Sequence, residues 1–253
     1  MKHKQIIYLI AIILISTSYV FAGDHNNIIQ KVCIPDRFPA WYNQSWMTNS
    51  RYSPEFEVLD TESSLGRYAP MTKTITVKDI IKFHGHPCDG LLVCAAGLKL
   101  GLSRLFPSGI IDRTDLRVLT KNSPCFVDTC AYLTGGRINF GTLEIDNSLG
   151  WSWIIQRIST KKAVKVSLRK EALPEEVEIM EKKIREGRYK IADIDRCRNI
   201  QWKFARKILS HPLNKAFRIV TLENFIFPES TYPKTGKRGD ILHKNESYCS
   251  KEK

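Results

Sequence analysis

Cysteine, glycine and proline are all sparse in this sequence of 253 residues, which holds 7, 14 and 11 of them respectively. So little cysteine excludes a small disulfide-stapled scaffold, and so little glycine and proline excludes a collagen-like or low-complexity chain. Acidic residues are also few, 26 against 39 lysines and arginines, which gives a formal net charge of +13. Because 43% of the residues are hydrophobic, intrinsic disorder is excluded, and the length suits one large domain with an appendage.

Long apolar runs are absent except near the N-terminus. Two lysines precede an apolar run at residues 6–15, and Ala22 precedes Gly23 shortly after it. A positive start, an apolar core and a small residue are the three parts of a secretory signal peptide. The run is shorter than the roughly 20 residues of a spanning helix, so cleavage is favoured over an uncleaved anchor. We therefore expect a signal peptide at residues 1–22, cleavage before Gly23, and a periplasmic or secreted mature chain without a transmembrane helix.

The rest of the sequence divides into three parts. Residues 23–75 are polar and predict an irregular segment that packs onto the core, and residues 229–253 predict a loose, polar and basic tail. Residues 76–228 carry the periodic patterns of one domain. Helices are predicted at 77–83, 91–105, 125–133, 174–187 and 191–209, and strands at 116–120, 141–145, 151–157, 163–168 and 217–222.

This order of elements predicts an α+β fold in which a mainly antiparallel sheet packs against helices. The three consecutive strands at 141–145, 151–157 and 163–168 are separated by turn-like residues, and we expect them to form an antiparallel meander.

One short segment gathers three metal-ligating side chains. His84, His86 and Cys88 alternate along the sequence, and alternation in an extended segment points all three in one direction. Pro87 supports that geometry, because the residue before a proline is biased toward extended conformations. Imidazole and thiolate ligands suit zinc and other borderline divalent metals. The segment therefore predicts a metal site where the buried helix begins.

Cys125 repeats this placement in the first turn of the next predicted helix, and Asp128 follows one turn later on the same face. Two helix starts that converge would add Cys125 to the site as fourth ligand or nucleophile. A plain disulfide between Cys88 and Cys125 is the alternative in an oxidising compartment, although it leaves the histidine pair unexplained.

The other cysteines have simpler interpretations. Cys94 and Cys130 fall within apolar helices and are predicted to face the core as small hydrophobic residues. Cys33, Cys197 and Cys249 have no pairing that the sequence determines. Since seven is an odd number, at least one sulfur is a free thiol or a metal ligand.

Two blocks of this sequence resemble a known family, the FmdE family of formylmethanofuran dehydrogenase subunits. The first is Phe-His-Gly-His-Pro-Cys-Asp-Gly at residues 83–90, and the second is Asn-Ser-Pro-Cys-Phe-Val-Asp at residues 122–128 with Thr134-Gly135 after it. The resemblance runs from about Val77 to Phe225. It implies an α+β domain with zinc bound near the His-x-His-x-Cys segment and an active-site cysteine.

The sequence departs from the family pattern in three places. Asp89 stands where the family usually has proline and adds a carboxylate near the site. An acidic residue that is common shortly before the second cysteine is absent, with Thr120 near that place. Only Cys249 remains where some members carry a cysteine-rich zinc finger. Export separates this chain from a cytoplasmic formylmethanofuran dehydrogenase, so the family name does not imply its substrate.

These observations favour an exported domain in which His84, His86 and Cys88 hold zinc or another borderline divalent metal. Cys125 then serves as fourth ligand or nucleophile, and Asp128 orients a ligand or acts as a base toward a small-molecule or anionic ligand. Two alternatives stay open: a non-catalytic accessory or carrier protein for a metalloenzyme, and a basic domain that associates with anionic surfaces through clusters such as residues 234–238. Nucleic acid is not an expected partner; catalysis itself and a homodimer are left open.

Overall fold

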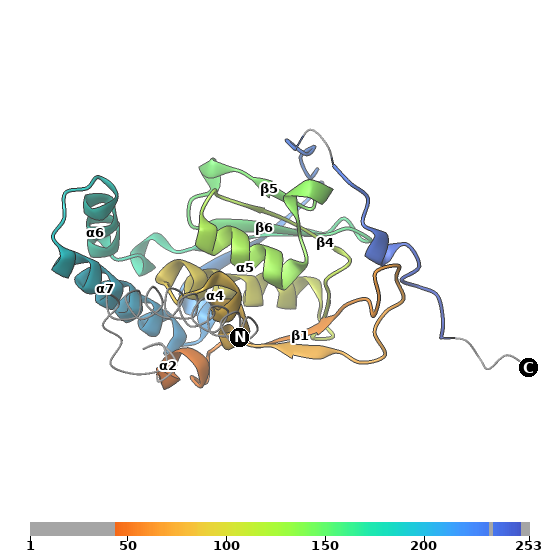
Figure 1. The fold of residues 1–253 in the computed structure, drawn as a ribbon, viewed down its shortest axis with the longest axis horizontal. Helices are drawn as coiled ribbons and strands as arrows, with labels where there is room; N and C mark the ends of the chain where they lie inside the picture. The colour runs from red at the N-terminus through yellow and green to blue at the C-terminus, as the bar shows by residue number, and fades with distance from the viewer. Residues whose placement is uncertain (1–43, 233–234, 249–253) are drawn as a thin grey trace, which may run out of the picture. The chain divides into compact units, whose positions relative to one another are not determined.

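The computed structural model describes residues 44–232 and 235–248, and in that part the chain forms an α+β fold (Figure 1). The helices are α2 (Ser45–Thr48), α3 (Val77–His84), α4 (Asp89–Leu105), α5 (Pro124–Thr134), α6 (Glu175–Arg185) and α7 (Ile191–Leu209). The strands are β1 (Phe56–Leu59), β2 (Lys73–Ile75), β3 (Ile110–Asp112), β4 (Leu116–Thr120), β5 (Leu143–Ile145), β6 (Ser152–Arg157), β7 (Ala163–Leu168) and β8 (Phe217–Leu222). Among the residues described, no helix combines the length and the apolar character that crossing a bilayer requires.

The main sheet has five strands in the order β5-β4-β6-β7-β8. Three of its four pairings are antiparallel, which confirms the predicted α+β fold with a mainly antiparallel sheet. Helix α4 packs across this sheet against β6 and β7, and α5 packs beside α4 and against β4 (Figure 1). The helix that carries Cys88 and the helix that carries Cys125 therefore share one side of the sheet.

Two glycines let α4 approach the sheet closely. A Cβ atom on Gly97 would lie 2.8 Å from the Trp153 ring, and one on Gly101 would lie 2.6 Å from Ile155 Cδ1. Trp153 and Ile155 point from β6 toward α4 and are fully buried. The opposite face of the sheet is covered by a smaller cluster that includes Leu119, Leu149, Ile154 and Phe227. Both faces of the central strand are thus buried.

The predicted meander is wrong in its first strand. β6 and β7 form the expected antiparallel hairpin, but β5 lies on the far side of β4 and pairs with it in parallel. A short 3-10 turn at Asn147–Leu149 then carries the chain back past β4 to β6. Residue patterns indicate that a segment is a strand, whereas its partner is chosen by tertiary packing.

The segment expected to be irregular holds regular structure in its described part. β1 pairs in an antiparallel manner with β2 and in parallel with β3, which makes a second sheet of three strands. Phe56 and Val58 of β1 and Met47 of α2 are fully buried. These strands have only three or four residues each, and residue patterns did not predict them.

The C-terminal tail is also not loose over its described residues. Gly236 N–H donates to Asn139 O at 2.8 Å, which attaches the segment near β5. Further along, the carbonyl oxygen of His243 accepts a hydrogen bond from Arg67 N–H at 3.0 Å. The Tyr248 hydroxyl donates to Tyr68 O at 2.8 Å. These contacts are made mainly with the backbone, so the composition of the tail does not predict them.

Asp115 ties the β6–β7 turn to the start of β4 and makes stability depend on pH. Its carboxylate accepts hydrogen bonds from Arg157 Nε at 2.8 Å, from Ser159 N at 2.7 Å and from Ser159 Oγ at 2.6 Å. Burial acts to raise the pKa of Asp115, but these hydrogen bonds outweigh it and leave the pKa below its usual value. The stabilisation is therefore fully present above the unfolded pKa of about 4 and is lost as the pH falls through the lower folded pKa.

We expect Asp115→Asn to reduce the free energy of unfolding at pH 7 by about 1–2 kcal/mol, since the pair with Arg157 is partly exposed to solvent. The difference from the wild type should shrink as the pH is lowered well below about 4, where the wild-type carboxyl group is protonated too. Urea unfolding of both proteins at the two pH values measures this. An equal difference at both would show that the charge of Asp115 contributes nothing.

Candidate metal centre

Two helix ends build the segment that carries the histidines and Cys88. α3 ends at His84, where Gly85 adopts a left-handed conformation (φ 96°) and its N–H bonds to Ile81 O at 2.8 Å. Glycine adopts this conformation with little strain, so the chain turns here. Cys88 is extended and caps α4, and its Sγ accepts a hydrogen bond from Leu91 N–H at 3.4 Å. The expected extended segment is therefore wrong at His84, which is the last residue of a helix.

Helix α7 holds this segment from the other side. Trp202 Nε1 donates a hydrogen bond to Pro87 O at 3.3 Å. The Trp202 ring also packs edge-on against Trp46, with ring centroids 6.4 Å apart. This role was not predicted, because nothing in the spacing of Trp202 connects it with a loop more than a hundred residues earlier.

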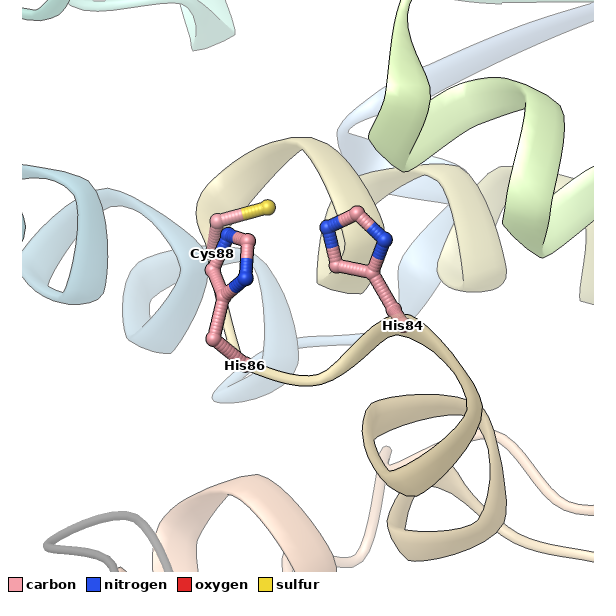
Figure 2. A group of neighbouring side chains, drawn as sticks. All are labelled: His84, His86 and Cys88. Carbon is pink, nitrogen blue, oxygen red and sulfur yellow. The ribbon is translucent and has the colours of Figure 1, made fainter. Parts of the chain in front are cut away.

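The side chains of His84, His86 and Cys88 converge on one point. Their ligand atoms all lie within 4.8 Å of one another, and the two imidazole centroids are 4.5 Å apart. Figure 2 shows the two rings and the sulfur turned toward a common space beside the start of α4. Ligand atoms around one tetrahedral zinc ion are about 3.3–3.8 Å apart, so this group is close to the spacing of a metal site.

Asp128 sets the orientation of the His84 ring. Its Oδ2 lies 2.7 Å from His84 Nδ1, so this nitrogen carries the proton that the carboxylate accepts. The His84 side chain is only 4% exposed, and its Nε2 is buried without a hydrogen-bond partner among the described residues. A carboxylate on one imidazole nitrogen that leaves the other free is the usual arrangement around metal-bound histidine.

Cys125 lies next to this group on α5. Its Sγ is 3.0 Å from Cys88 Sγ, which is longer than the 2.05 Å of a disulfide bond, and both cysteines are free thiols here. Gly90 makes the approach possible, because a Cβ atom there would lie 3.0 Å from Cys125 Cβ. The structure thus brings together all five residues that the sequence proposed for the site, with Cys125 and Asp128 at the edge of the three-ligand group.

The two thiols differ in acidity. The hydrogen bond from Cys88 and the nearby His84 ring lower the pKa of Cys125 to about 6, although burial acts against this. The same hydrogen bond, which Cys88 donates, raises the pKa of Cys88 together with burial. Burial and the neighbouring His84 lower the pKa of His86, so His86 is neutral at pH 7 and able to bind a cation. Without metal, Cys125 is therefore the thiolate of the pair.

Asp89, the residue after Cys88, is buried and is 2% exposed. Its Oδ1 accepts a hydrogen bond from Gly90 N–H at 2.8 Å, whereas Oδ2 has no partner among the described residues. Burial, and to a lesser degree Glu181, raises the pKa of Asp89 to about 7. Asp89 does not belong to the three-residue ligand group.

The remaining cysteines lie away from the ligands. Cys94 and Cys130 are fully buried where α4 meets α5, as their apolar surroundings predicted. Cys197 is buried on α7 as a free thiol. Cys33 and Cys249 fall outside the described residues, so their expected alternatives for pairing stay predictions.

The family model described as FmdE, molybdenum formylmethanofuran dehydrogenase operon, matches residues 83–218, just over half of the chain. The chain belongs to the FmdE family. The FmdE match includes both histidines, Cys88, Cys125 and Asp128. A tungsten formylmethanofuran dehydrogenase FmdE-like protein from Syntrophus aciditrophicus, whose crystal structure is known, is 19% identical over 58% of this chain and 69% of the other, with a TM-score of 0.40. No curated protein matches the sequence.

Proposed function

We propose that this FmdE-family protein is exported and that it uses a zinc ion, held by His84, His86 and Cys88, to bind and process a small molecule beside the thiolate of Cys125. The observation that carries the proposal is the buried His84 Nε2, which makes no hydrogen bond of normal length and angle in the described chain, while Asp128 holds the opposite nitrogen and the ring is close enough to Cys125 to lower the pKa of that thiol. A buried polar atom without a partner is costly unless something binds it. A cation shared with His86 and Cys88 satisfies it.

The donor set fits zinc. Two imidazoles and one thiolate are borderline and soft ligands, and three protein ligands leave a fourth position for water or substrate, as in catalytic zinc sites. A zinc ion bound there supplies Lewis-acid polarisation of a ligand atom at that position. The raised pKa of Cys88 requires that this thiol lose its proton when metal binds, so metal affinity should increase with pH.

Cys125 is better suited to be a nucleophile than a fourth ligand. Cys125 Sγ lies 3.0 Å from Cys88 Sγ, but Cys125 does not belong to the group of three residues whose ligand atoms converge. The thiolate of Cys125 is half-buried and therefore within reach of a bound molecule. Asp128 accepts a hydrogen bond from His84, so we assign it the role of positioning His84 rather than that of a base.

Export is the second part of the proposal and rests on the leader pattern of residues 1–22, which lie outside the described residues. An exported protein of this kind meets oxidising conditions, under which zinc-bound thiolates are protected from forming disulfides. Sequencing of the mature protein should give Gly23 as its first residue.

A carrier role for a metalloenzyme is the second candidate, and the exposure of His86 favours it. One ligand at the surface allows the ion to be handed to another protein, whereas His84 and Cys88 are shielded. Association with anionic surfaces through the tail has less support. Arg238 is paired with Asp240 at 2.6 Å and is 8% exposed, and Lys234 lies outside the described residues.

Elemental analysis of the mature protein, purified from the compartment to which it is exported, tests the metal site. We expect about one zinc ion, or one other borderline divalent ion, per chain. Thiol titration of the native protein should give a higher count after a chelator is added, because the chelator frees Cys88. Protein that contains no metal and has a disulfide between Cys88 and Cys125 would contradict the proposal.

A further inference from the structure

Lys121 lies in the short loop between β4 and α5, four residues before Cys125. Its ammonium group sits over two aromatic rings, 4.7 Å from the centroid of Phe126 and 5.0 Å from that of Trp151. Within the described chain it forms no hydrogen bond, and no carboxylate lies within 4.0 Å of its Nζ. An ammonium group has three donors, so a half-buried lysine of this kind lacks acceptors that a ligand can supply.

The acidic groups nearby do not take up these donors. Glu181 accepts hydrogen bonds from Arg185 at 3.1 Å and from Gln201 at 2.9 Å. Asp89 is bonded to Gly90 N–H and lies too far from Lys121 for an ion pair. Both carboxyl groups act on Lys121 only through longer-range electrostatics, as does Cys125. Lys121 is therefore within electrostatic range of Cys125 and is not neutralised by direct contact.

The start of α5 adds one further donor beside Lys121. Ser123 is the N-cap residue of this 11-residue helix, but its side chain makes no capping hydrogen bond. Pro124 has no N–H and the Cys125 N–H interacts with its own sulfur, so the Phe126 N–H and the positive end of the helix dipole are what can attract an anion here. The loop that follows β4 thus presents a cation and a helix start next to the Cys125 thiolate.

We propose that Lys121 and the start of α5 bind the carboxylate of a small carboxylic acid whose other end reaches the metal site and Cys125. The inference rests on the function proposed above and names the substrate class of that site. A singly charged carboxylate fits better than a phosphate, because Asp89 and Glu181 are near enough to repel a second negative charge. Lys121 is then a positioning residue that selects the substrate.

The test uses full-length protein loaded with Co²⁺, whose absorption spectrum reports thiol binding to the metal. Two probes are titrated at low ionic strength, 3-mercaptopropionate and its neutral counterpart 3-mercaptopropanol. The wild type should bind the carboxylate probe about tenfold more tightly, because a charge-assisted hydrogen bond is added. Lys121→Met should abolish this preference, and Lys121→Arg should restore much of it.

Lys165→Met is the matched control, since Lys165 is also half-buried but lies on β7. This variant should keep the full preference. Equal binding of the two probes by the Co²⁺-loaded wild type, or an unchanged preference in Lys121→Met, would overturn the role of Lys121 while leaving the metal site intact. Failure of the wild type to bind Co²⁺ would instead overturn the proposed function, and this inference with it.

Discussion

Replacing His84 by alanine is expected to weaken zinc binding by more than about 100-fold, because even the outer partners of zinc ligands contribute 10–100-fold. The imidazole supplies one of three ligand atoms, and its side chain is 4% exposed. Water can enter the space that alanine leaves, but it is a weaker ligand than imidazole and is not held by Asp128. Competition with a chromophoric chelator gives the dissociation constants of both proteins.

A graded comparison separates ligand loss from general damage. Asp128→Asn removes the carboxylate that orients His84 but leaves every ligand in place, so we expect a loss of about 10–100-fold. His211→Ala is the control, since His211 is an exposed histidine beyond the end of α7, and zinc affinity should not change. If His84→Ala binds zinc as tightly as His211→Ala, the ion is not held at this site.

Trp153→Ala is expected to reduce the free energy of unfolding by about 3–5 kcal/mol, the range for removing a fully buried large aromatic side chain. Trp153 is 0% exposed and fills the space between β6 and α4. Its ring lies against Gly97, and its centroid is 5.0 Å from that of Phe126 and 6.4 Å from that of Phe217. These neighbours belong to three different elements, α4, α5 and β8, so they cannot move together to close the cavity.

Chemical denaturation of the metal-free protein measures this loss without a contribution from the ion. Tyr189→Ala is a suitable comparison, because Tyr189 is 45% exposed, and its replacement should change stability by no more than about 0.5 kcal/mol. A loss below about 1 kcal/mol for Trp153→Ala would mean that α4 moves onto the sheet and fills the cavity. In that case the spacing between Cys88 and Cys125 should change as well.

The sequence predicted the long elements of the fold well because their signals are local. Thr76 donates hydrogen bonds to Asp79 at the start of α3, and Ser123-Pro124 begins α5 as expected. Strands β1, β2 and β3 have three or four residues each and were missed, whereas the equally short β5 was predicted within 141–145. The partner of β5 was also missed, because pairing depends on which strand edge is free after the helices have packed.

In the candidate site, too, some residues were predicted from the sequence and others were found only in the structure. Residue types and spacing identified the two histidines, Cys88, Cys125 and Asp128. Two histidines and a cysteine at alternating positions are typical of a metal site, and a second cysteine at a helix start suggested a partner for them. Lys121 and Trp202 carried no such signal, because a lysine in a loop and a tryptophan on a helix have many ordinary uses. Their relation to the site appears only when β4, α5 and α7 are placed around it.

By itself the sequence determined which side chains can bind a metal and where the two helices that carry them begin. These properties follow from chemical identity and from neighbours along the chain. Only the tertiary structure decided that Cys125 lies 3.0 Å from Cys88 and that Asp128 holds His84 at 2.7 Å. The reason is that both distances depend on how closely α4, α5 and the end of α3 pack together. Gly90 contributes to that approach, because a Cβ atom there would lie only 3.0 Å from Cys125 Cβ and would push the two helices slightly apart.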